Sequence, residues 1–211
     1  MTNVVIIDYG MGNIHSVYKA VVNVLEKNSN VKVTTSLSDI KDSSHIIFPG
    51  QGAVSSCMNS ISNTFDINEF KQCIHDKPFL GICMGLQVVM SYSDEDGGVD
   101  CLNLIDGKVS SFEDIGKNLK IPHMGWNNVA HNSTHNIWKN IENNSFFYFV
   151  HSYYVEPDDS NVILGTTNYG KKFTSVIHKD NIIACQFHPE KSSTKGLQFL
   201  KNFLTWNGDD H

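Results

Sequence analysis

The chain has 211 residues and a formal net charge of -6, from 16 Lys and Arg residues against 22 Asp and Glu residues. No basic run occurs, so nothing favours nucleic-acid binding, and a small molecule or another protein is the expected partner. No apolar stretch is long enough to span a bilayer and the N-terminus lacks the basic start of a signal peptide, which predicts a cytoplasmic protein without a membrane contact.

The N-terminal segment is typical of the first strand, loop and helix of a parallel α/β sheet. An apolar run over residues 4–8 is followed by helical spacing over residues 17–25. The loop between them holds a Gly-x-Gly pair, but His15 stands where the dinucleotide fingerprint needs its third glycine, so no cofactor site is expected. Two interpretations of the loop stay open: a tight turn in which Asn13 caps the helix, or a loop with a role at the surface.

Two further strands are predicted over residues 31–35 and 45–48, and the second stops at a glycine loop over residues 49–53. Ligands of open parallel sheets lie beyond the carboxyl ends of the strands, so this loop is expected at a binding edge. A backbone with two glycines can turn its N–H groups toward a developing oxyanion, which makes Gly50 and Gly52 candidate donors. An ordinary turn is the alternative.

The most informative stretch runs from Pro78 to Met90, where Cys83 stands between an apolar run and a run with helical spacing. Gly81 and Gly85 lie two residues before and after the cysteine, which is the pattern of a nucleophile elbow between strand and helix. At such a junction the helix N-terminus favours the reactive thiolate. A buried, inert cysteine is the alternative, because one cysteine without a base proves little.

Beyond the elbow the pattern changes to short β-like runs separated by turns, of which Asp106-Gly107 and Lys179-Asp180-Asn181 are the clearest. We predict strands over residues 102–105, 108–112, 119–121, 146–154, 162–167, 172–178 and 182–187. Helices are predicted over residues 53–61, 66–76 and 194–206, and the polar segment 94–98 is expected to be a solvated loop. The whole predicts an α/β fold: an open, mostly parallel central sheet flanked by helices, with antiparallel strands in the second half, in a single domain over residues 1–211.

A candidate base stands near the end of the sequence, at His188-Pro189-Glu190. The residue before a proline favours extended conformations, and side chains two apart in an extended chain point to the same side, so Glu190 is expected to reach the His188 imidazole. With Cys83 they form the thiol version of a catalytic triad, in which His188 activates the thiol and Glu190 fixes its tautomer. A lone His-Pro-Glu is more often a surface turn; the elbow cysteine favours catalysis.

Nothing in the sequence predicts a metal site. The five cysteines are an odd number without C-x-x-C spacing, and no pair of histidines has ligand spacing with a supporting carboxylate. Two histidines on predicted strands have open roles: His151 is either structural or near a ligand pocket, and His123 either packs or faces a partner.

These motifs resemble those of class I (triad-type) glutamine amidotransferases, and within that class the glutaminase subunits of imidazole glycerol phosphate synthases. The class motifs are Gly81 to Gln87 and Phe187 to Ser192. The phrases typical of the subunits are Ile7 to Asn13, Pro49 to Ala53, Pro122 to Asn127 and Tyr148 to Tyr154. The likeness runs the whole length and implies the flavodoxin-like fold of that class.

The resemblance implies hydrolysis of L-glutamine by Cys83, His188 and Glu190, through a thioester and without a cofactor. It implies that the oxyanion donors belong to the backbone of Gly50, Gln51 and Gly52. The residues that it implies for substrate binding are Met84, Gln87, Ser152 and Tyr153. Related chains often have an aliphatic residue where this one has Gln51, a difference expected to change loop dynamics rather than chemistry.

The resemblance also implies a partner. The family passes its ammonia to a (β/α)8-barrel cyclase in a 1:1 heterodimer, which makes imidazole glycerol phosphate and a carboxamide ribotide for histidine biosynthesis. Asn13, Trp126 and Lys191 are then the candidate interface residues. Three alternatives stay open: a paralogue that feeds ammonia to a sugar-modifying amidotransferase in surface-polysaccharide assembly, a binding subunit with a dead site, and a cysteine peptidase on the same fold.

Overall fold

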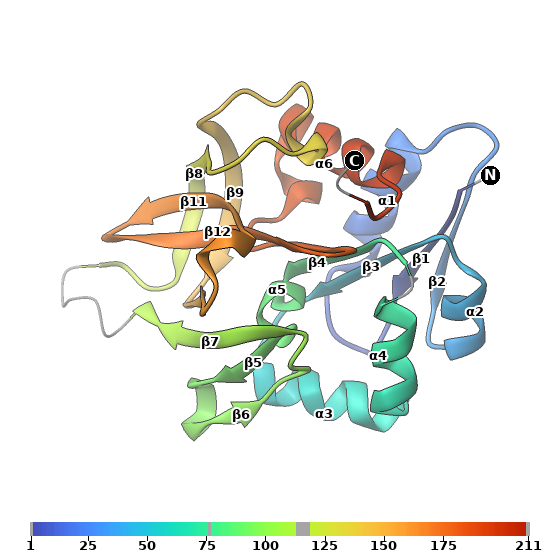
Figure 1. The fold of residues 1–211 in the computed structure, drawn as a ribbon, viewed down its shortest axis with the longest axis horizontal. Coiled ribbons are helices and arrows are strands. Elements are labelled where there is room, and N and C mark those ends of the chain that lie inside the picture. The colour runs from blue at the N-terminus through green and yellow to red at the C-terminus, as the bar shows by residue number, and fades with distance from the viewer. Residues whose placement is uncertain (1, 76, 113–118, 210–211) are drawn as a thin grey trace.

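A computed structural model describes residues 2–75, 77–112 and 119–209 (Figure 1). The first half alternates strands and helices, as its hydrophobic periodicity predicts. Its strands are β1 (Asn3–Ile7), β2 (Asn30–Thr34), β3 (His45–Gly50) and β4 (Phe79–Cys83). Its helices are α1 (Ile14–Val24), α2 (Leu37–Asp42), α3 (Val54–Thr64), α4 (Ile67–His75) and α5 (Met84–Val88).

The second half is rich in strands and short 3-10 turns, and it contains the helix α6 (Ser193–Thr205). Its strands are β5 (Met90–Ser93), β6 (Val99–Asp100), β7 (Ile105–Ser111), β8 (His123–His131), β9 (Ser145–His151), β10 (Tyr153–Pro157), β11 (Ile163–Tyr169), β12 (Lys171–Lys179) and β13 (Ile182–Cys185). The 3-10 turns are η1 (Glu95–Gly97), η3 (Asn136–Trp138), η4 (Ser160–Val162) and η5 (Pro189–Lys191). No helix of the described residues is long and apolar enough to cross a membrane.

One long sheet runs through the molecule in the order β2-β1-β3-β4-β13-β12-β10-β7-β5-β6. The five strands from β2 to β13 are parallel, whereas β12 and β10 run antiparallel to their neighbours. A side branch extends from β12 through β11 and β8 to β9. The predicted α/β class, with antiparallel strands in the second half, is confirmed.

The inner parallel strands β1, β3, β4 and β13 are mostly apolar because both faces of the sheet are covered there, whereas the edge strand β2 has exposed polar residues. Successive residues of a strand point to opposite faces, so β1 divides its side chains between two cores. Val4 and Ile6 pack in one core with residues of α1 and α6, and Val5 and Ile7 pack in the other with residues of α2, α3, α4 and α5. Figure 1 shows α1 and α6 on one side of the sheet and α3 and α4 on the other.

Four details of the predicted second half are wrong. Residues 102–104 form no strand, and β7 begins only at Ile105. Residues 119–121 form no strand, and the strand pairing that was expected there starts only at His123. The predicted strand over residues 146–154 is broken at Ser152, where the chain leaves its partner β8 and joins β7 in the main sheet. Asp106-Gly107 lies inside β7 instead of in a turn. At Ser152 and at Asp106-Gly107, pairing between distant segments overrides the local pattern.

The sheet brings three distant segments to one edge. β13 runs parallel to β4, with Ala184 opposite Gly81 and Cys185 opposite Ile82. On the other side of β4, the end of β3 places Gly50 opposite Cys83. The carboxyl ends of these three strands therefore lead to the glycine loop, the elbow and the His-Pro-Glu segment, side by side.

Candidate active site

Cys83 stands at the junction of β4 and α5 with φ 55° and ψ -99°, a backbone conformation that L-residues rarely adopt. The close approach of strand and helix requires both flanking glycines. A Cβ on Gly81 would lie 2.6 Å from the Gly85 carbonyl oxygen, and a Cβ on Gly85 would collide with the Phe48 carbonyl oxygen. The structure therefore has the geometry of a nucleophile elbow, with Cys83 at the wall of a cavity.

His188 follows β13 and leads into η5, with Pro189 at the first position of that turn. Its backbone N–H donates to the Tyr148 carbonyl oxygen at 2.9 Å, and its carbonyl oxygen accepts from the Ser192 hydroxyl at 2.6 Å. Its Nδ1 lies 2.9 Å from Oε1 of Glu190, and the two side chains are only 7% and 1% exposed. Because a carboxylate accepts, Nδ1 carries a proton and Nε2 is left for the cavity.

The charges around His188 favour its protonated form. Burial alone would lower the pKa of the imidazole, but the Cys83 sulfur and the Glu190 carboxylate beside it raise the pKa to about 10. The buried Nε2 has no hydrogen-bond partner among the described residues. The Cys83 sulfur thus lies beside a protonated His188 ring. Such a ring stabilises a thiolate nucleophile and can donate its Nε2 proton in the same site.

A cavity of about 330 Å³ lies at this edge of the sheet, and both Cys83 and His188 line it. The predicted binding residues that line it are Gln51, Gly52, Met84, Gln87, Ser152 and Tyr153. Gly50 does not line the cavity itself but lies opposite Cys83 in the pairing of β3 with β4. The structure thus brings the sequence-predicted catalytic and binding residues together around a space that suits an amino acid.

The glycine loop over residues 49–53 rests on the first loop of the chain. A Cβ on Gly12 would touch the Gly50 Cα at 3.5 Å, and a Cβ on Gly52 would lie 2.8 Å from the Met11 methyl group. Gly52 has φ +95°, a conformation that favours glycine. The Asn13 side chain caps α1 by accepting the Ser16 N–H at 3.3 Å, as the turn interpretation predicts. The N-terminal loop therefore supports the candidate oxyanion donors.

The sequence profile of the family "Glutamine amidotransferase class-I" matches residues 5–206. This chain belongs to that family. The amidotransferase has a TM-score of 0.73 to a crystal structure of a glutamine amidotransferase, at 13% identity over 97% of this chain and 99% of the other. For a chain of PurLQS from Thermotoga maritima the TM-score is 0.70, at 14% identity over 96% and 97% of the two chains. At these identities the solved structures support the fold.

Sequence relatives of this amidotransferase are subunits of one enzyme. It is 50% identical to the imidazole glycerol phosphate synthase subunit HisH of Hydrogenovibrio crunogenus over 206 residues, which are 97% of each chain. It is 48% identical to the subunit HisH of Acinetobacter baylyi over 208 residues, which are 98% of this chain and 100% of the relative. Identity at this level over the full length makes the amidotransferase a member of the HisH group.

Sequence reasoning missed Glu95, which lies in the segment expected to be a solvated loop. The segment forms η1, and Glu95 lines the cavity of the amidotransferase. Its Oε2 accepts the Val54 backbone N–H at 2.7 Å, at the start of α3. Burial raises the pKa of this carboxyl above its ordinary value. No local pattern distinguishes Glu95 from its acidic neighbours, because only the tertiary fold brings this turn to the cavity.

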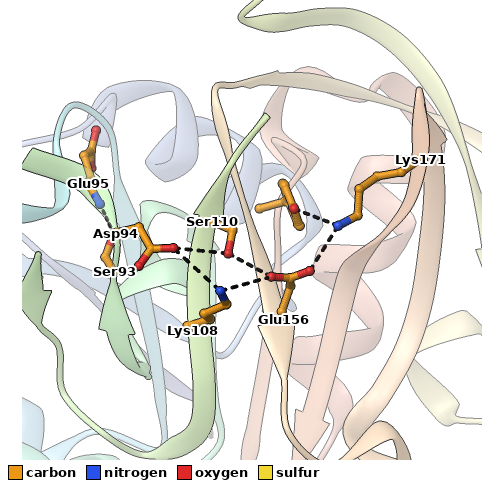
Figure 2. Close-up of polar contacts among 8 residues, drawn as sticks. Ser93, Asp94, Glu95, Lys108, Ser110, Glu156 and Lys171 are labelled. Carbon is orange, nitrogen blue, oxygen red and sulfur yellow. Dashed lines mark hydrogen bonds and ion pairs between the residues drawn. The ribbon is translucent and has the colours of Figure 1, made fainter. Parts of the chain in front are cut away.

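Polar contacts hold the turn that carries Glu95 against the sheet (Figure 2). The Ser110 hydroxyl lies 3.4 Å from an Asp94 oxygen and donates to Glu156 at 2.8 Å. Lys108 Nζ lies 3.8 Å from Asp94 and 3.9 Å from Glu156, and Glu156 also pairs with Lys171 at 3.0 Å. The network joins the residue before η1 to β7, β10 and β12, so these strands help to set the position of Glu95.

Gln186 is a second residue that the sequence analysis did not assign to the site. It is fully buried, with Nε2 3.6 Å from Cys83 Sγ and Oε1 3.4 Å from Gln87 Nε2. It thus lies between the candidate nucleophile and a candidate binding residue. Its place two residues before His188, at the end of the strand predicted over residues 182–187, was the available signal, since side chains two apart in a strand share a side.

Of the candidate interface residues, Lys191 alone lines the cavity. Trp126, on β8, is 53% exposed, and its ring lies 6.1 Å from that of Tyr148. Lys191 lines the cavity, with its Nζ 5.9 Å from the Tyr148 ring. Asn13 is exposed and follows Gly12, which packs against the glycine loop. Trp126 and Lys191 therefore lie near the same aromatic ring, that of Tyr148, whereas Asn13 lies in the N-terminal loop.

The two histidines with open roles, His151 and His123, are both buried. His151 lines the cavity, and His123 lies directly against the His151 ring. The near-ligand interpretation of His151 and the packing interpretation of His123 therefore hold. Among residues 2–75, 77–112 and 119–209, no group of three or more His, Cys, Asp or Glu side chains could hold a metal ion.

Proposed function

We propose that this amidotransferase is the glutaminase subunit of an imidazole glycerol phosphate synthase and supplies ammonia for histidine biosynthesis. The observation that carries the proposal is one cavity lined by an elbow cysteine and by a histidine that is paired with a buried glutamate. Identity of 48–50% to HisH subunits over the full length supports the choice of substrate and pathway.

In the first half-reaction, the Cys83 thiolate attacks the side-chain amide carbon of L-glutamine, and the carbonyl π electrons move to its oxygen. Backbone N–H groups of Gly50, Gln51 and Gly52 donate to this oxyanion, each such donor being worth about 3 kcal/mol of barrier. The C–N bond then breaks as His188 gives its Nε2 proton to the departing nitrogen. Ammonia leaves, and a thioester remains on Cys83.

In the second half-reaction, water attacks the thioester carbon while the now neutral His188 takes a proton from that water at Nε2. The C–S bond breaks, which forms the γ-carboxylic acid and restores the thiolate and imidazolium. The acid loses its remaining proton to solvent and leaves as glutamate. Glu190 accepts from Nδ1 throughout, which fixes the tautomer of His188 and stabilises its charge.

The walls of the cavity offer groups for both ends of the substrate. Glu95 supplies a negative charge for the α-ammonium group of glutamine. Gln87, Ser152 and Tyr153 surround the same space with amide, hydroxyl and backbone groups, and Met84 provides apolar contact for the methylenes. A recognition site for an amino acid needs this combination of one charge, several polar groups and an apolar wall.

We infer that the partner is a (β/α)8-barrel cyclase that forms a 1:1 heterodimer in the cytoplasm. Free ammonia would be protonated and diluted in water, so a sealed passage into the partner preserves it. The exposed Trp126 and the cavity-lining Lys191, which both lie near the Tyr148 ring, support docking of the partner near the cavity, with Asn13 in the N-terminal loop as a further candidate contact. The unbroken strand order across the main sheet supports the folding of residues 1–211 as one domain.

The alternative of a sugar-pathway paralogue is not favoured, because the relatives of high identity are HisH subunits. A dead binding subunit is disfavoured by the intact Cys83, His188 and Glu190 in one site. A cysteine peptidase is disfavoured because the family profile that matches residues 5–206 is that of glutamine amidotransferases.

The test is a substitution of Cys83 in the complex with the cyclase. Cys83→Ala is expected to abolish glutamine-dependent synthesis of imidazole glycerol phosphate, while synthesis with added ammonium salts survives, because only the ammonia supply is lost. Cys73→Ala is the matched control, since Cys73 is buried in α4 and does not line the cavity. Loss of both activities in Cys83→Ala, or retention of both, would contradict the proposal.

A further inference from the structure

The wall of the cavity that contains Ser152 and Tyr153 is a corner in the chain. β9 pairs with β8 up to His151, and β10 begins at Tyr153 in the main sheet, so the chain changes partner at Ser152. Ser152 lies outside both ladders, and its carbonyl oxygen accepts the Phe112 N–H at 3.0 Å. Since this corner lines the candidate glutamine site, whatever fixes its conformation also sets the shape of the site.

A continuous chain of side-chain hydrogen bonds ends at this corner. Asn127 Nδ2 lies 3.2 Å from His123 Nε2, and His123 Nδ1 lies 2.8 Å from His151 Nε2. His151 Nδ1 lies 2.7 Å from the Tyr153 carbonyl oxygen, so the His151 side chain spans the corner. The same carbonyl oxygen accepts from Gln87 Nε2 at 3.4 Å. The series of hydrogen bonds therefore reaches Gln87, a residue of the candidate binding site.

Backbone groups at both ends determine the direction of every bond in this chain. Asn127 Nδ2 donates to the Asn168 carbonyl oxygen at 3.0 Å, and Asn127 Oδ1 accepts the Asn128 N–H at 2.8 Å, so His123 Nε2 must be an acceptor. At the other end, the Tyr153 carbonyl oxygen can only accept, so His151 Nδ1 must donate. His123 Nδ1–H then donates to His151 Nε2, and both rings are neutral with their proton on Nδ1.

The surroundings of the two rings agree with this state. His123 and His151 are 3% and 6% exposed. The His123 ring stacks on Tyr169 at 4.1 Å, and the His151 ring lies 5.2 Å from Phe173. Burial lowers the pKa of His123 to about 4 and that of His151 to about 3, with His188 adding to the effect on His151. Both rings therefore stay neutral beside the protonated His188.

We propose that His123 is a positioning residue for glutamine binding, which acts through the tautomer of His151 on the corner at Ser152. As long as His123 donates to Nε2 of His151, the His151 proton stays on Nδ1 and holds the Tyr153 carbonyl oxygen. Without that donor, His151 can move its proton to Nε2 or turn its ring. The hydrogen bond from His151 to the Tyr153 carbonyl oxygen is then lost. The role in glutamine binding rests on the proposed function, whereas the tautomers do not.

The first experiment reads the tautomers directly in the full chain by ¹⁵N NMR of the imidazole rings near neutral pH. Signals are assigned by their loss in His123→Asn and His151→Asn. Protonated Nδ1 and unprotonated Nε2 in both rings is the expected result. An Nε2–H tautomer in either ring, or a ring with both nitrogens protonated, would overturn the proposal. This result does not depend on any activity, so it remains decisive if glutamine is not the substrate.

The second experiment compares two substitutions of His123 by their kinetics in the complex with the cyclase. The amide nitrogen of His123→Asn occupies the place of Nδ1 and keeps a donor for His151, whereas His123→Leu has none. We expect His123→Leu to raise KM for glutamine about tenfold with kcat within about threefold, and His123→Asn to stay within about twofold of the wild type in KM. Equal KM values for both variants would mean that His123 only fills space, and would overturn the proposal.

Asn127→Asp tests the same chain should His123→Leu fail to fold. Asn127 is half-buried, and the substitution replaces the donor to His123 by an acceptor of the same shape. The carboxylate makes His123 protonate Nε2 and raises its pKa, so the comparison is made at a pH above that pKa, where a neutral His123 can no longer donate to His151. A rise in KM for glutamine of about fivefold or more is expected, with the His151 proton partly on Nε2. An unchanged KM and an unchanged His151 spectrum would refute the coupling.

Discussion

At the residue scale, the chemistry of the site depends on one buried imidazole that lies between a carboxylate and a cysteine sulfur. Glu190 holds Nδ1 of His188, and Cys83 lies toward Nε2, so the protonated ring is favoured although burial opposes it. The same interaction links catalysis to stability, because the folded protein binds this proton more tightly than the unfolded chain does.

The expected consequence is a pH dependence of the free energy of unfolding. The pKa of His188 is raised from 6.5 to about 10, so the stabilisation is fully present below about pH 6.5 and is lost as the pH rises toward 10. Between about pH 6.5 and 9.5, wild-type stability should fall by at least about 1 kcal/mol more than that of His188→Asn. Urea unfolding measures this, with His15→Asn, an exposed histidine, as control. Parallel pH curves for wild type and His188→Asn would contradict the assignment.

At the scale of elements, the elbow depends on how closely α5 approaches β3 and β4. Gly81 contacts the Gly85 carbonyl group, and Gly85 contacts the Phe48 carbonyl group, so neither position has room for a side chain. The short helix is held by this packing, because five residues are too few to form a stable helix alone.

Gly85→Ala should therefore push α5 away from β3 and move Cys83. We expect a loss of about 2–3 kcal/mol in the free energy of unfolding and slower alkylation of Cys83 by iodoacetamide. Gly97→Ala is the matched control: Gly97 has φ +84° with nothing within 4 Å of its Cβ position, so only about 1 kcal/mol should be lost, without effect on the thiol. Similar alkylation rates in the two variants would argue against the tight elbow.

At the scale of the whole molecule, the side branch β11-β8-β9 presents apolar side chains to solvent. Met124 and Phe146 are each 60% exposed and Trp126 is 53% exposed, all on β8 and β9. Exposed apolar groups that gather on paired strands are typical of a docking surface, and interfaces are enriched in Trp and Met.

If the cyclase docks on this surface, Trp126→Lys should weaken its binding at least about tenfold, since a central tryptophan is a common hot spot. Isothermal titration calorimetry of the two purified subunits measures the change. Tyr92→Lys is the control, because Tyr92 is also a partly exposed aromatic residue. It lies on β5, next to the last strand β6 of the main sheet and not on the side branch. Equal effects of the two substitutions would place the docking surface elsewhere.

Local patterns in the sequence determined the fold class and the centre of the site. The elbow around Cys83 and the His188–Glu190 pair were predictable because glycine spacing and an X-Pro step act within a few residues. The tertiary structure decided what depends on distant segments: the break at Ser152, Glu95 and Gln186 at the cavity, and the hydrogen bond from His123 to His151. A sequence pattern reports how a residue relates to its neighbours in the chain, whereas these contacts arise only when strand pairing brings remote side chains together.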